Sequence, residues 1–334
     1  MPEGSGDQEQ IFDVVIIGSG AAGLAAAVYA GRYRIKTVVV GEEFGGETAT
    51  GGTVENYPGF MSIEGLDLML KFREQAEKLG VVVADDKIVR VARDAHCFTA
   101  TGKSLKAYQG HAVIFAMGSK RRRLGLPNEK ELTGRGVHYC ITCDGPVYTG
   151  KTIAIVGGGD ASVKGLNLAA QYVEKMYLIV RGDAVTAEPI NLENMKKLGE
   201  KVEVLLGTEV KEIHGTTKLE KLTLSKPHKG SADLVVDGLF VEIGAEPNVA
   251  LARMLGVELD ARGYIKTDNM MKTNVDGVFV AGDATNFFDG FKQDITAAAM
   301  GAVAATSAYN DHKIHGELCP YHAIPLKYEE LKTA

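Results

Sequence analysis

The apolar and polar positions along this chain predict alternating strands and helices joined by glycine-rich turns. An apolar run over residues 11–17 ends in the turn GSGAAG at 18–23, and an Ala-rich helical segment follows to Gly31. A second apolar run, over 36–40, stands where the return strand of a βαβ unit is expected. Together these segments predict strand, tight turn, helix and parallel strand, an arrangement that presents a helix N-terminus to the pyrophosphate of a dinucleotide.

The same pattern recurs in the middle of the chain. Residues 151–156 form another buried-strand pattern, the turn GGGDAS at 157–162 opens a helix, and an apolar run covers 176–180. Ser162 takes the place of the third small residue of the turn, and serine is small enough for the helix to pack on the strand. Two such units predict two dinucleotides. The alternative is a duplicated fold whose second site no longer binds a ligand.

A third pattern lies nearer the C-terminal end. Residues 277–284 predict a strand that ends in Ala-Gly-Asp and leads through Gln293 to an Ala-rich helix, which brings backbone amides and a carboxylate toward a polar ligand. If this ligand is the first dinucleotide, the first domain is discontinuous, with residues 1–119 and 247–334, and residues 120–246 are inserted. We therefore predict an α/β protein with two Rossmann-like domains of the three-layer ββα type, one inserted in the other.

Length, composition and charge agree with this prediction. A chain of 334 residues is long enough for two domains, and 45% hydrophobic with 24% charged residues is typical of globular proteins. The 37 basic and 43 acidic residues give a formal charge of −6, which disfavours nucleic acid or an anionic membrane as a partner. No apolar run approaches the ~18 residues of a membrane span, and the polar N-terminus does not resemble a signal peptide, so we expect a cytoplasmic protein.

A pair of cysteines is the clearest chemical signal. Cys140 and Cys143 form a C-x-x-C motif, and Asp144 follows it directly. In a reducing cytosol such a pair is more often catalytic or metal-binding than structural. A zinc site needs four ligands, and the sequence has no second C-x-x-C and only His138 close by. The spacing suits thiol–disulfide exchange, with Asp144 either as general acid and base or as a helix N-cap.

Taken in order, these motifs resemble those of the low-molecular-weight thioredoxin reductases over about residues 11–309. The resemblance implies a homodimer whose first domain binds FAD and whose inserted domain carries a nicotinamide nucleotide site and the redox disulfide. It also implies that Cys143 faces the flavin and that Cys140 attacks thioredoxin or a similar small redoxin, while Asp144 assists the proton transfers. The shared motifs are SGAAG at 19–23, GG at 45–46 with VENYPG at 54–59, CITCDG at 140–145, GGG at 157–159 and AGD at 281–283.

The resemblance further assigns cofactor-binding residues. Glu43, with Glu42 as its alternative, is the candidate for the FAD ribose, and Glu47 stands where the family commonly has glutamine. The residues assigned to FAD are Gly18, Ser19, Gly20, Ala21, Ala22, Gly23, Glu43, Gly46, Glu47, Asn56, Gly118, Gly282, Asp283, Lys292, Gln293, Asp294 and Ile295. The residues assigned to the nicotinamide nucleotide are Gly157, Gly159, Asp160, Ala161 and Arg181.

The identity of the electron donor stays open at this point. The family reads the 2′-phosphate of NADPH with a His-Arg-Arg-x-x-x-Arg segment, because guanidinium groups pair well with phosphate. The corresponding segment of this chain is VRGDAVT at 180–186, which keeps only Arg181. Asp183 is a candidate for the 2′-hydroxyl of NADH. NADPH and NADH are the leading donors, with ferredoxin or a deazaflavin as alternatives.

Two rival functions use the same motifs. A dithiol oxidase would close the dithiols of small substrates and pass the electrons to oxygen. A redox-sensing or interaction protein would keep FAD without turnover, although the presence of Cys140, Cys143 and Asp144 argues against it.

The remaining cysteines carry no assigned chemistry. Cys97 lies in a strand-like stretch and is expected to be buried as a small apolar residue. A C-terminal cluster could ligate zinc or provide a third redox thiol, and an exposed surface tail is the favoured interpretation. This cluster consists of His312, His315, Cys319 and His322.

Overall fold

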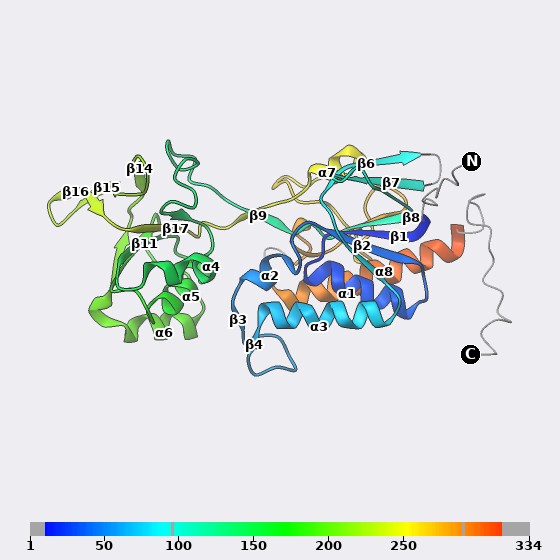
Figure 1. Ribbon diagram of the computed structural model, residues 1–334, viewed down its shortest axis with the longest axis horizontal. Helices are drawn as coiled ribbons and strands as arrows, with labels where there is room; N and C mark the ends of the chain where they lie inside the picture. The colour runs from blue at the N-terminus through cyan, green and yellow to red at the C-terminus, as the bar shows by residue number, and fades with distance from the viewer. Residues whose placement is uncertain (1–10, 95–96, 289–290, 316–334) are drawn as a thin grey trace, which may run out of the picture. The chain divides into compact units, whose positions relative to one another are not determined.

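The computed structural model describes residues 11–94, 97–288 and 291–315. The chain divides into two compact units, one made of residues 1–119 and 247–334 and the other of residues 120–246. Each unit is an α/β structure built on a mainly parallel sheet (Figure 1), which confirms the predicted fold class. No helix within the described residues is long and apolar enough to cross a membrane.

A seven-stranded sheet forms the centre of the first unit. Its strands are β1 (Ile11–Ile17), β2 (Thr37–Gly41), β5 (Val82–Asp85), β6 (Ile88–Asp94), β7 (Cys97–Gly102), β8 (Ala107–Phe115) and β19 (Val278–Val280). Their order is β5-β2-β1-β8-β7-β6, with β19 also paired to β8. The pairs formed by β1, β2, β5, β8 and β19 are parallel, whereas β6, β7 and β8 form an antiparallel meander.

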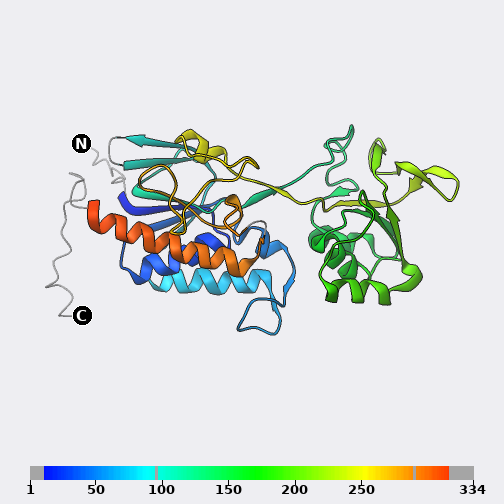
Figure 2. The same ribbon diagram turned by 180° about the vertical axis from the view of Figure 1, so that it is seen from behind.

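Three helices cover one face of this sheet, and they lie side by side in both views (Figures 1 and 2). On β1, Val14 and Ile16 pack in the core on the helical side, whereas Val15 and Ile17 pack in a second core on the opposite side. Burial on both faces explains why this strand has an unbroken apolar sequence. The helices are α1 (Ala21–Arg32), α3 (Gly65–Lys78) and α8 (Asp294–His315).

Shorter elements of the first unit follow or connect these strands. Because the carboxyl ends of parallel strands meet at one edge of a sheet, the turns after β1, β2, β8 and β19 are neighbours. The chain leaves and re-enters this unit along β9 (Ser119–Arg121) and β18 (Ala245–Pro247), which pair with each other. The other short elements are α2 (Gly46–Thr50), β3 (Thr53–Val54), β4 (Ile63–Glu64), α7 (Ala250–Met254) and η3 (Gly282–Ala284).

A five-stranded parallel sheet forms the centre of the second unit. Helices pack on one of its faces, and a small antiparallel sheet packs on the other. The parallel strands, in sheet order, are β10 (Val137–His138), β17 (Gly238–Val241), β11 (Thr152–Val156), β12 (Lys175–Val180) and β13 (Val202–Leu206). The helices are α4 (Ile141–Asp144), α5 (Asp160–Ala169) and α6 (Pro189–Lys197), with short 3₁₀ turns η1 (Gly145–Tyr148) and η2 (Gly199–Lys201). The antiparallel strands are β14 (Val210–His214), β15 (Lys221–His228) and β16 (Ser231–Val235).

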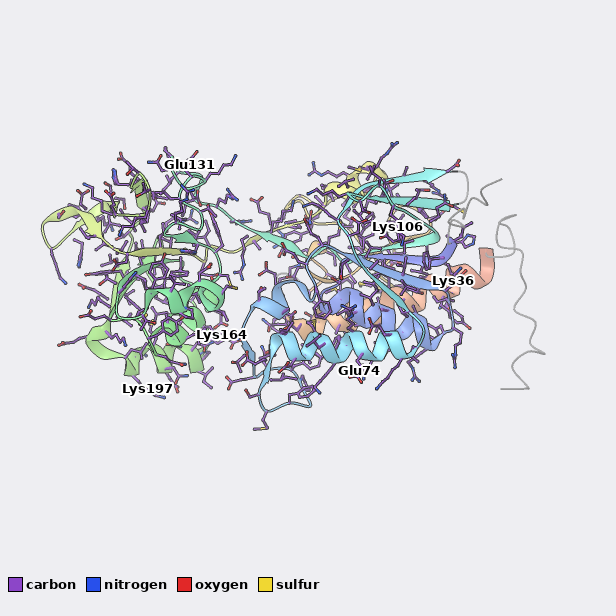
Figure 3. All side chains as sticks on the ribbon, viewed as in Figure 1. Lys36, Glu74, Lys106, Glu131, Lys164 and Lys197 are labelled. Carbon is purple, nitrogen blue, oxygen red and sulfur yellow. A yellow bond between two sulfur atoms is a disulfide. The ribbon has the colours of Figure 1, made fainter. Side chains whose placement is uncertain are left out.

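Both faces of β11 are buried, as they are for β1. Ile153 and Ile155 pack with residues of α5 in one core, and Ala154 packs with residues of the antiparallel sheet in another. Charged side chains of both signs are exposed on each unit, among them Glu74 and Lys197 (Figure 3). The two glycine turns predicted from the sequence follow β1 and β11, so each lies at the carboxyl end of a buried parallel strand.

Candidate active site

The turn after β1 is so tight that two of its glycines have no room for a side chain. A Cβ atom added at Gly18, whose φ is 114°, would lie 2.2 Å from the carbonyl oxygen of Ala116. One added at Gly23 would lie 1.9 Å from the carbonyl oxygen of Gly18. Gly20, the N-cap of α1, is different, because the nearest atom to an added Cβ would be 3.8 Å away. This position therefore leaves space beside the helix N-terminus.

A second backbone turn lies against the first. The Gly45 amide donates a hydrogen bond of 3.0 Å to the Ser19 carbonyl, and a Cβ added at Gly46 would come within 3.5 Å of the Gly20 Cα. The first N–H groups of a helix such as α1 have no partner within the helix, and the helix dipole makes this end positive. The structure thus brings both predicted glycine segments to a place suited to a phosphate group.

Two acidic residues follow β2, and they differ in their contacts. The Glu42 carboxylate forms an ion pair of 2.7 Å with Lys87. The backbone carbonyl of Glu43 accepts hydrogen bonds of 3.2 Å from the Ser19 hydroxyl and from the Gly46 amide. The backbone of Glu43 is therefore anchored to both glycine turns, whereas the Glu42 side chain is directed to Lys87.

Two side-chain hydrogen bonds join the start of α8 to the segment around α2 and β3. Asn56 Nδ2 donates to Gln293 Oε1 at 2.8 Å, and Thr48 Oγ1 donates to Asp294 Oδ1 at 2.5 Å. Asn56, Gln293 and Asp294 are all residues that the resemblance assigns to FAD, and the structure places them together. Thr48 was not indicated by the sequence, because no motif marks it.

Lys292 holds the backbone of the turn that follows β19. Its ammonium group donates hydrogen bonds to the carbonyls of Thr285 and Asp283 and lies 4.5 Å from the centroid of the Tyr264 ring. Burial lowers the pKa of Lys292 and raises the pKa of Asp283, and the attraction between the two groups opposes both shifts. The predicted residues Gly282, Asp283 and Lys292 thus form one connected turn.

In the second unit, the turn after β11 repeats the geometry of the first. Gly157 has a φ of 146°, and an added Cβ would lie 2.3 Å from the Glu242 carbonyl oxygen, whereas nothing lies within 4 Å of one added at Gly159. Asp160, the first residue of α5, accepts hydrogen bonds at Oδ1 from the Glu188 amide at 3.0 Å and from a side-chain amide of α6 at 2.8 Å. These bonds hold α6 against the glycine turn.

The segment after β12 folds back on this turn. The Thr186 amide donates a hydrogen bond of 2.7 Å to the Gly158 carbonyl. Arg181 is exposed and lies near Glu209, whose pKa is lowered chiefly by a hydrogen bond and charge from Lys211 and further by Arg181. The segment therefore presents a cation to solvent beside the second glycine turn.

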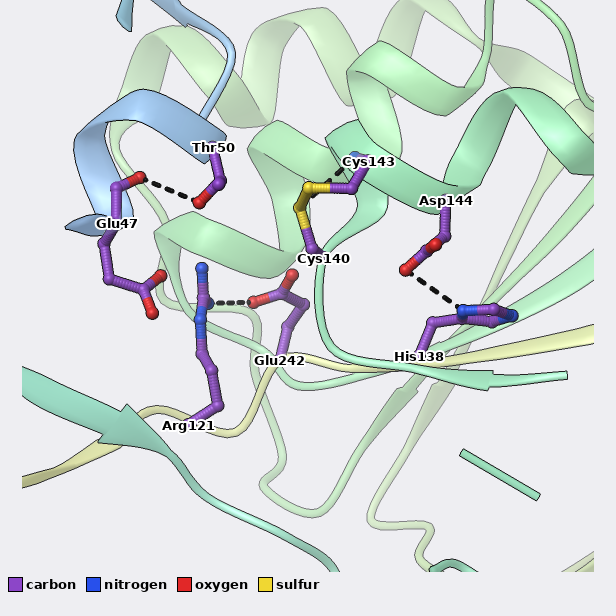
Figure 4. The surroundings of a disulfide bond; sticks show 8 residues. All are labelled: Glu47, Thr50, Arg121, His138, Cys140, Cys143, Asp144 and Glu242. Atoms are coloured by element: carbon purple, nitrogen blue, oxygen red, sulfur yellow. Dashed lines mark hydrogen bonds and ion pairs between the residues drawn. A yellow bond between two sulfur atoms is a disulfide. The ribbon is translucent and has the colours of Figure 1, made fainter. Parts of the chain in front are cut away.

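Cys140 and Cys143 form a disulfide at the start of α4 (Figure 4). Their Cα atoms are 5.4 Å apart, and the Cys143 amide donates a hydrogen bond of 3.2 Å to the Cys140 sulfur. Cys143 is exposed and Cys140 is half-buried. The disulfide expected from the C-x-x-C spacing is present, and one of its sulfur-bearing residues is open to a partner.

Asp144 contacts a histidine. Its Oδ2 atom lies 3.0 Å from Nδ1 of His138, as Figure 4 shows, and Nε2 of the same ring lies 2.7 Å from the hydroxyl of Tyr148. Asp144 precedes η1, but its side chain makes no capping hydrogen bond to that turn. The carboxylate is therefore oriented by His138 and does not serve as a helix cap.

The sequence indicated His138 only as a nearby candidate metal ligand, and its contacts with Asp144 and Tyr148 were not predicted. In an extended strand, residues two apart share a side, so His138 on β10 could have been connected with Cys140. No sequence pattern indicates Tyr148, because its place beside the imidazole depends on how η1 turns back toward β10.

The other predicted residues lie in or beside these turns. Ala21 and Ala22 are buried in the first turn of α1, Ala161 is exposed in the first turn of α5, and Gly118 follows β8 with a φ of 60°. Glu47 belongs to the first turn of α2, and Ile295 to that of α8. Asp183 is exposed after β12.

Metal ligation finds no support in the described part of the chain, where no group of three or more His, Cys, Asp and Glu residues could hold an ion. The side chains of the C-terminal cluster, from His312 to His322, lie outside those described. Cys97 is half-buried on β7, opposite Asp94, where the sequence predicted a buried small apolar residue.

The chain is similar to known disulfide reductases over most of its length. Residues 12–305 match the pyridine nucleotide-disulphide oxidoreductase family. A thioredoxin reductase of Bacillus subtilis is 38% identical over 303 residues, which are 90% of this chain and 94% of that protein. The structures of thioredoxin reductases from T. acidophilum and Lactococcus lactis match with TM-scores of 0.84, at 32% and 31% identity, over 91% and 90% of this chain and 100% and 98% of theirs. This chain therefore belongs to the pyridine nucleotide-disulphide oxidoreductase family and, within it, to the low-molecular-weight thioredoxin reductases.

Proposed function

We propose that this protein is a thioredoxin-disulfide reductase, which takes electrons from a reduced donor and uses the Cys140–Cys143 pair to reduce thioredoxin or a similar small redoxin. The observation that carries the proposal is the disulfide itself, which joins an exposed and a half-buried cysteine beside a carboxylate. Exchange with a partner needs an accessible sulfur and a group that handles a proton, whereas a purely structural disulfide needs neither. The names of the similar proteins support the same function.

The first unit fits FAD. The space at Gly20, beside an uncapped helix N-terminus, suits the pyrophosphate, and Glu43 is favoured for the ribose because Glu42 pairs with Lys87. Bound FAD would supply a two-electron carrier between the donor and the disulfide. The residues that we assign to it are Gly18, Ser19, Gly20, Ala21, Ala22, Gly23, Glu43, Gly46, Glu47, Asn56, Gly118, Gly282, Asp283, Lys292, Gln293, Asp294 and Ile295.

The second unit fits a nicotinamide nucleotide, because its glycine turn is open at Gly159 in front of α5. Arg181 is the one arginine kept from the family's 2′-phosphate segment, so we propose that NADPH binds weakly compared with other family members, or that NADH is the donor. Gly157, Asp160 and Ala161 complete this assignment.

The two cysteines and Asp144 account for the exchange with the partner. In the dithiol form, the cysteine that the resemblance assigns to the partner is Cys140, although Cys143 is the more exposed residue in the disulfide form. The Cys140 thiolate attacks a sulfur of the redoxin disulfide, forms a mixed disulfide and releases one redoxin thiolate. The Cys143 thiolate then attacks Cys140, restores the Cys140–Cys143 bond and releases the second thiolate. Two electrons leave the protein, and each departing thiolate takes up one proton. Asp144 accepts the proton of a cysteine thiol as the thiolate forms and passes it to a departing redoxin thiolate.

Assembly and location are further parts of this proposal. Exposed apolar side chains in the loop before α3 and in the first two turns of this helix support a homodimer interface there, namely Phe60, Met61, Leu66 and Leu70. Light scattering after size exclusion should give twice the chain mass of 35.7 kDa, and a monomer mass would contradict the homodimer.

We also propose a cytoplasmic location. A C-x-x-C pair that serves exchange, and not structure, is typical of reducing compartments.

The donor is tested by anaerobic reduction of the FAD-loaded protein. NADPH and NADH are mixed separately with the protein, and bleaching of the flavin absorbance band is followed in time. Fast bleaching by either nucleotide supports the proposed donor class and identifies the nucleotide. No bleaching by either, while dithionite still bleaches the band, would contradict a nicotinamide donor and leave ferredoxin or a deazaflavin to be tested.

The acceptor step is tested with cysteine variants. Cys140→Ser and Cys143→Ser should each abolish thioredoxin reduction, because the exchange needs both an attacking and a resolving sulfur. The matched control is Cys97→Ser, which removes a cysteine far from the motif in sequence and should keep the wild-type rate. Full-rate reduction of thioredoxin by Cys143→Ser would contradict the mechanism.

A further inference from the structure

Two polar contacts link Asp144, His138 and Tyr148 in series in the second unit. The Asp144 carboxylate, 41% exposed, lies 3.0 Å from Nδ1 of His138, and the Tyr148 hydroxyl lies 2.7 Å from Nε2. The imidazole at the centre of this series is buried, with 9% of its side chain exposed. The series therefore runs from a buried phenol, through a buried ring, to a carboxylate that reaches solvent one residue after Cys143.

The chemistry of the two end groups sets which nitrogen of the ring carries a hydrogen. Once Asp144 has given up its proton, the carboxylate can only accept, so Nδ1 of His138 then carries the hydrogen that faces it. Nε2 of the neutral ring is then an acceptor, and the Tyr148 hydroxyl donates to it. Burial, with the charges of Asp144 and Asp237, raises the pKa of Tyr148, so this phenol keeps its proton. A phenol that stays protonated selects the histidine tautomer and takes no part in carrying a proton.

Aromatic packing fixes the imidazole in this position. The His138 ring stacks on Phe240 with centroids 5.3 Å apart and an interplanar angle of 24°, and Tyr148 meets it edge-on at 5.5 Å. Tyr148 also contacts Phe240 edge-on at 5.6 Å. Because Phe240 belongs to the inner strand β17 and is fully buried, the ring is held by the core of the unit and not by a surface loop.

We infer that His138 is a positioning residue for Asp144: its Nδ1–H fixes the orientation of the carboxylate and stabilises the negative charge left when Asp144 gives a proton to a departing thiolate. Tyr148 completes the device by fixing the tautomer of the ring. The inference rests on the proposed function, since it concerns the proton that accompanies disulfide exchange. In proteins, the partner of one imidazole nitrogen commonly sets which nitrogen carries the proton and how the ring is oriented, and Tyr148 has this role for His138.

The leaving group of the attacked disulfide provides a test that a merely structural histidine would not pass. An alkyl thiolate is basic and leaves faster when an acid protonates it, whereas an aryl thiolate is a good leaving group without a proton. The FAD-loaded protein is reduced anaerobically with dithionite, desalted and mixed with bis(hydroxyethyl) disulfide or with dithiobis(nitrobenzoate). The rates of disulfide reduction with the two probes are then compared in each variant.

The variants separate the hydrogen bond from the packing. Asp144→Asn should slow the alkyl disulfide by about 100-fold, and His138→Leu by about tenfold, while the aryl disulfide changes by less than about threefold in both. His138→Asn, whose side-chain amide places an N–H near the position of Nδ1, should recover the alkyl rate to within about threefold of wild type. The matched control is His214→Leu on β14, which should change neither rate.

Each result decides between these possibilities. An equal loss with both probes in His138→Leu, or no loss with either, would overturn the positioning role while the proposed function stands. A wild-type dithiol that reduces neither probe would overturn the proposed function and the inference with it. If His138→Leu does not fold, Tyr148→Phe provides the test, because it removes only the hydroxyl. It should slow reduction of the alkyl disulfide about threefold and leave reduction of the aryl disulfide unchanged. The same fold-loss with both probes, relative to wild type, would overturn the inference.

Discussion

The side-chain amide of Asn56 donates a 2.8 Å hydrogen bond to the side-chain carbonyl of Gln293, across 237 residues of sequence. This bond joins the segment after β3 to the residue just before α8. It closes the first unit on the side where the turns after β1 and β2 meet. The two sequence segments that make up the first unit are therefore connected by side chains that we assign to FAD.

The first prediction concerns this bond. Asn56→Ala should raise the dissociation constant of FAD by about threefold to tenfold, because one hydrogen bond that positions Gln293 is lost. The measurement is a fluorescence titration of the apoprotein with FAD. In a double-mutant cycle, Gln293→Ala should add little to Asn56→Ala, since both remove the same bond. Thr53→Ala, on β3 of the same segment, is the control, and fully additive effects of Asn56 and Gln293 would contradict the prediction.

The second prediction separates two glycines of one turn. Gly20 has an extended backbone and room for a Cβ, so Gly20→Ala should fold normally but bind FAD at least about tenfold more weakly, because the methyl group occupies the space that suits the pyrophosphate. Gly23→Ala places a Cβ against the Gly18 carbonyl and should lower the melting temperature by roughly 5 °C or more. Calorimetry of both apoproteins and FAD titration of Gly20→Ala test this pair. Unchanged FAD affinity in Gly20→Ala would refute the placement of the pyrophosphate.

The third prediction concerns nucleotide preference. Arg181 is exposed, so Arg181→Ala should raise the KM for NADPH by about tenfold and change the KM for NADH by less than about twofold, since only NADPH carries the 2′-phosphate. Steady-state kinetics with both nucleotides provide the measurement. Lys211→Ala, which removes an exposed cation from β14, is the matched control. Equal changes with both nucleotides would mean that Arg181 does not read the phosphate.

The fourth prediction concerns alkaline pH. Burial, together with a 2.7 Å hydrogen bond to Glu129, raises the pKa of Tyr139 from 10.0 to about 12. Between these values the unfolded chain releases a proton that the folded protein retains, so this contribution to stability is complete below pH 10 and is lost as the pH rises toward 12.

An absorbance titration of tyrosinate tests this directly. Wild-type protein should show a component that titrates late, and Tyr139→Phe should reduce this component by one phenol and lose less stability over the same interval. Tyr29→Phe, which removes an exposed phenol, should leave the late component in place. A late component of unchanged size in Tyr139→Phe would argue that Glu129 does not retain the phenol proton.

Much of this protein follows from its sequence because the relevant signals are local. The unbroken apolar run of β1 reflects burial on both faces, and the strand appears at Ile11–Ile17 as the pattern predicts. Gly18 and Gly23 mark a turn that tolerates no side chain, which is a property of a few consecutive residues. The pairing of Cys140 with Cys143 likewise needs only a spacing of three residues and one turn of helix.

The tertiary structure alone decided the contacts that join distant segments. Nothing near Asn56 in sequence indicates Gln293, and nothing in the CITCDG motif indicates that Tyr148 and Phe240 hold a histidine beside Asp144. The ion pair between Glu42 and Lys87, which supports our proposal of Glu43 for the ribose, likewise depends on the connection between β5 and β6. Hydrophobic period and glycine spacing determine which elements form, whereas side-chain partners depend on how those elements pack, and that packing is a property of the whole chain.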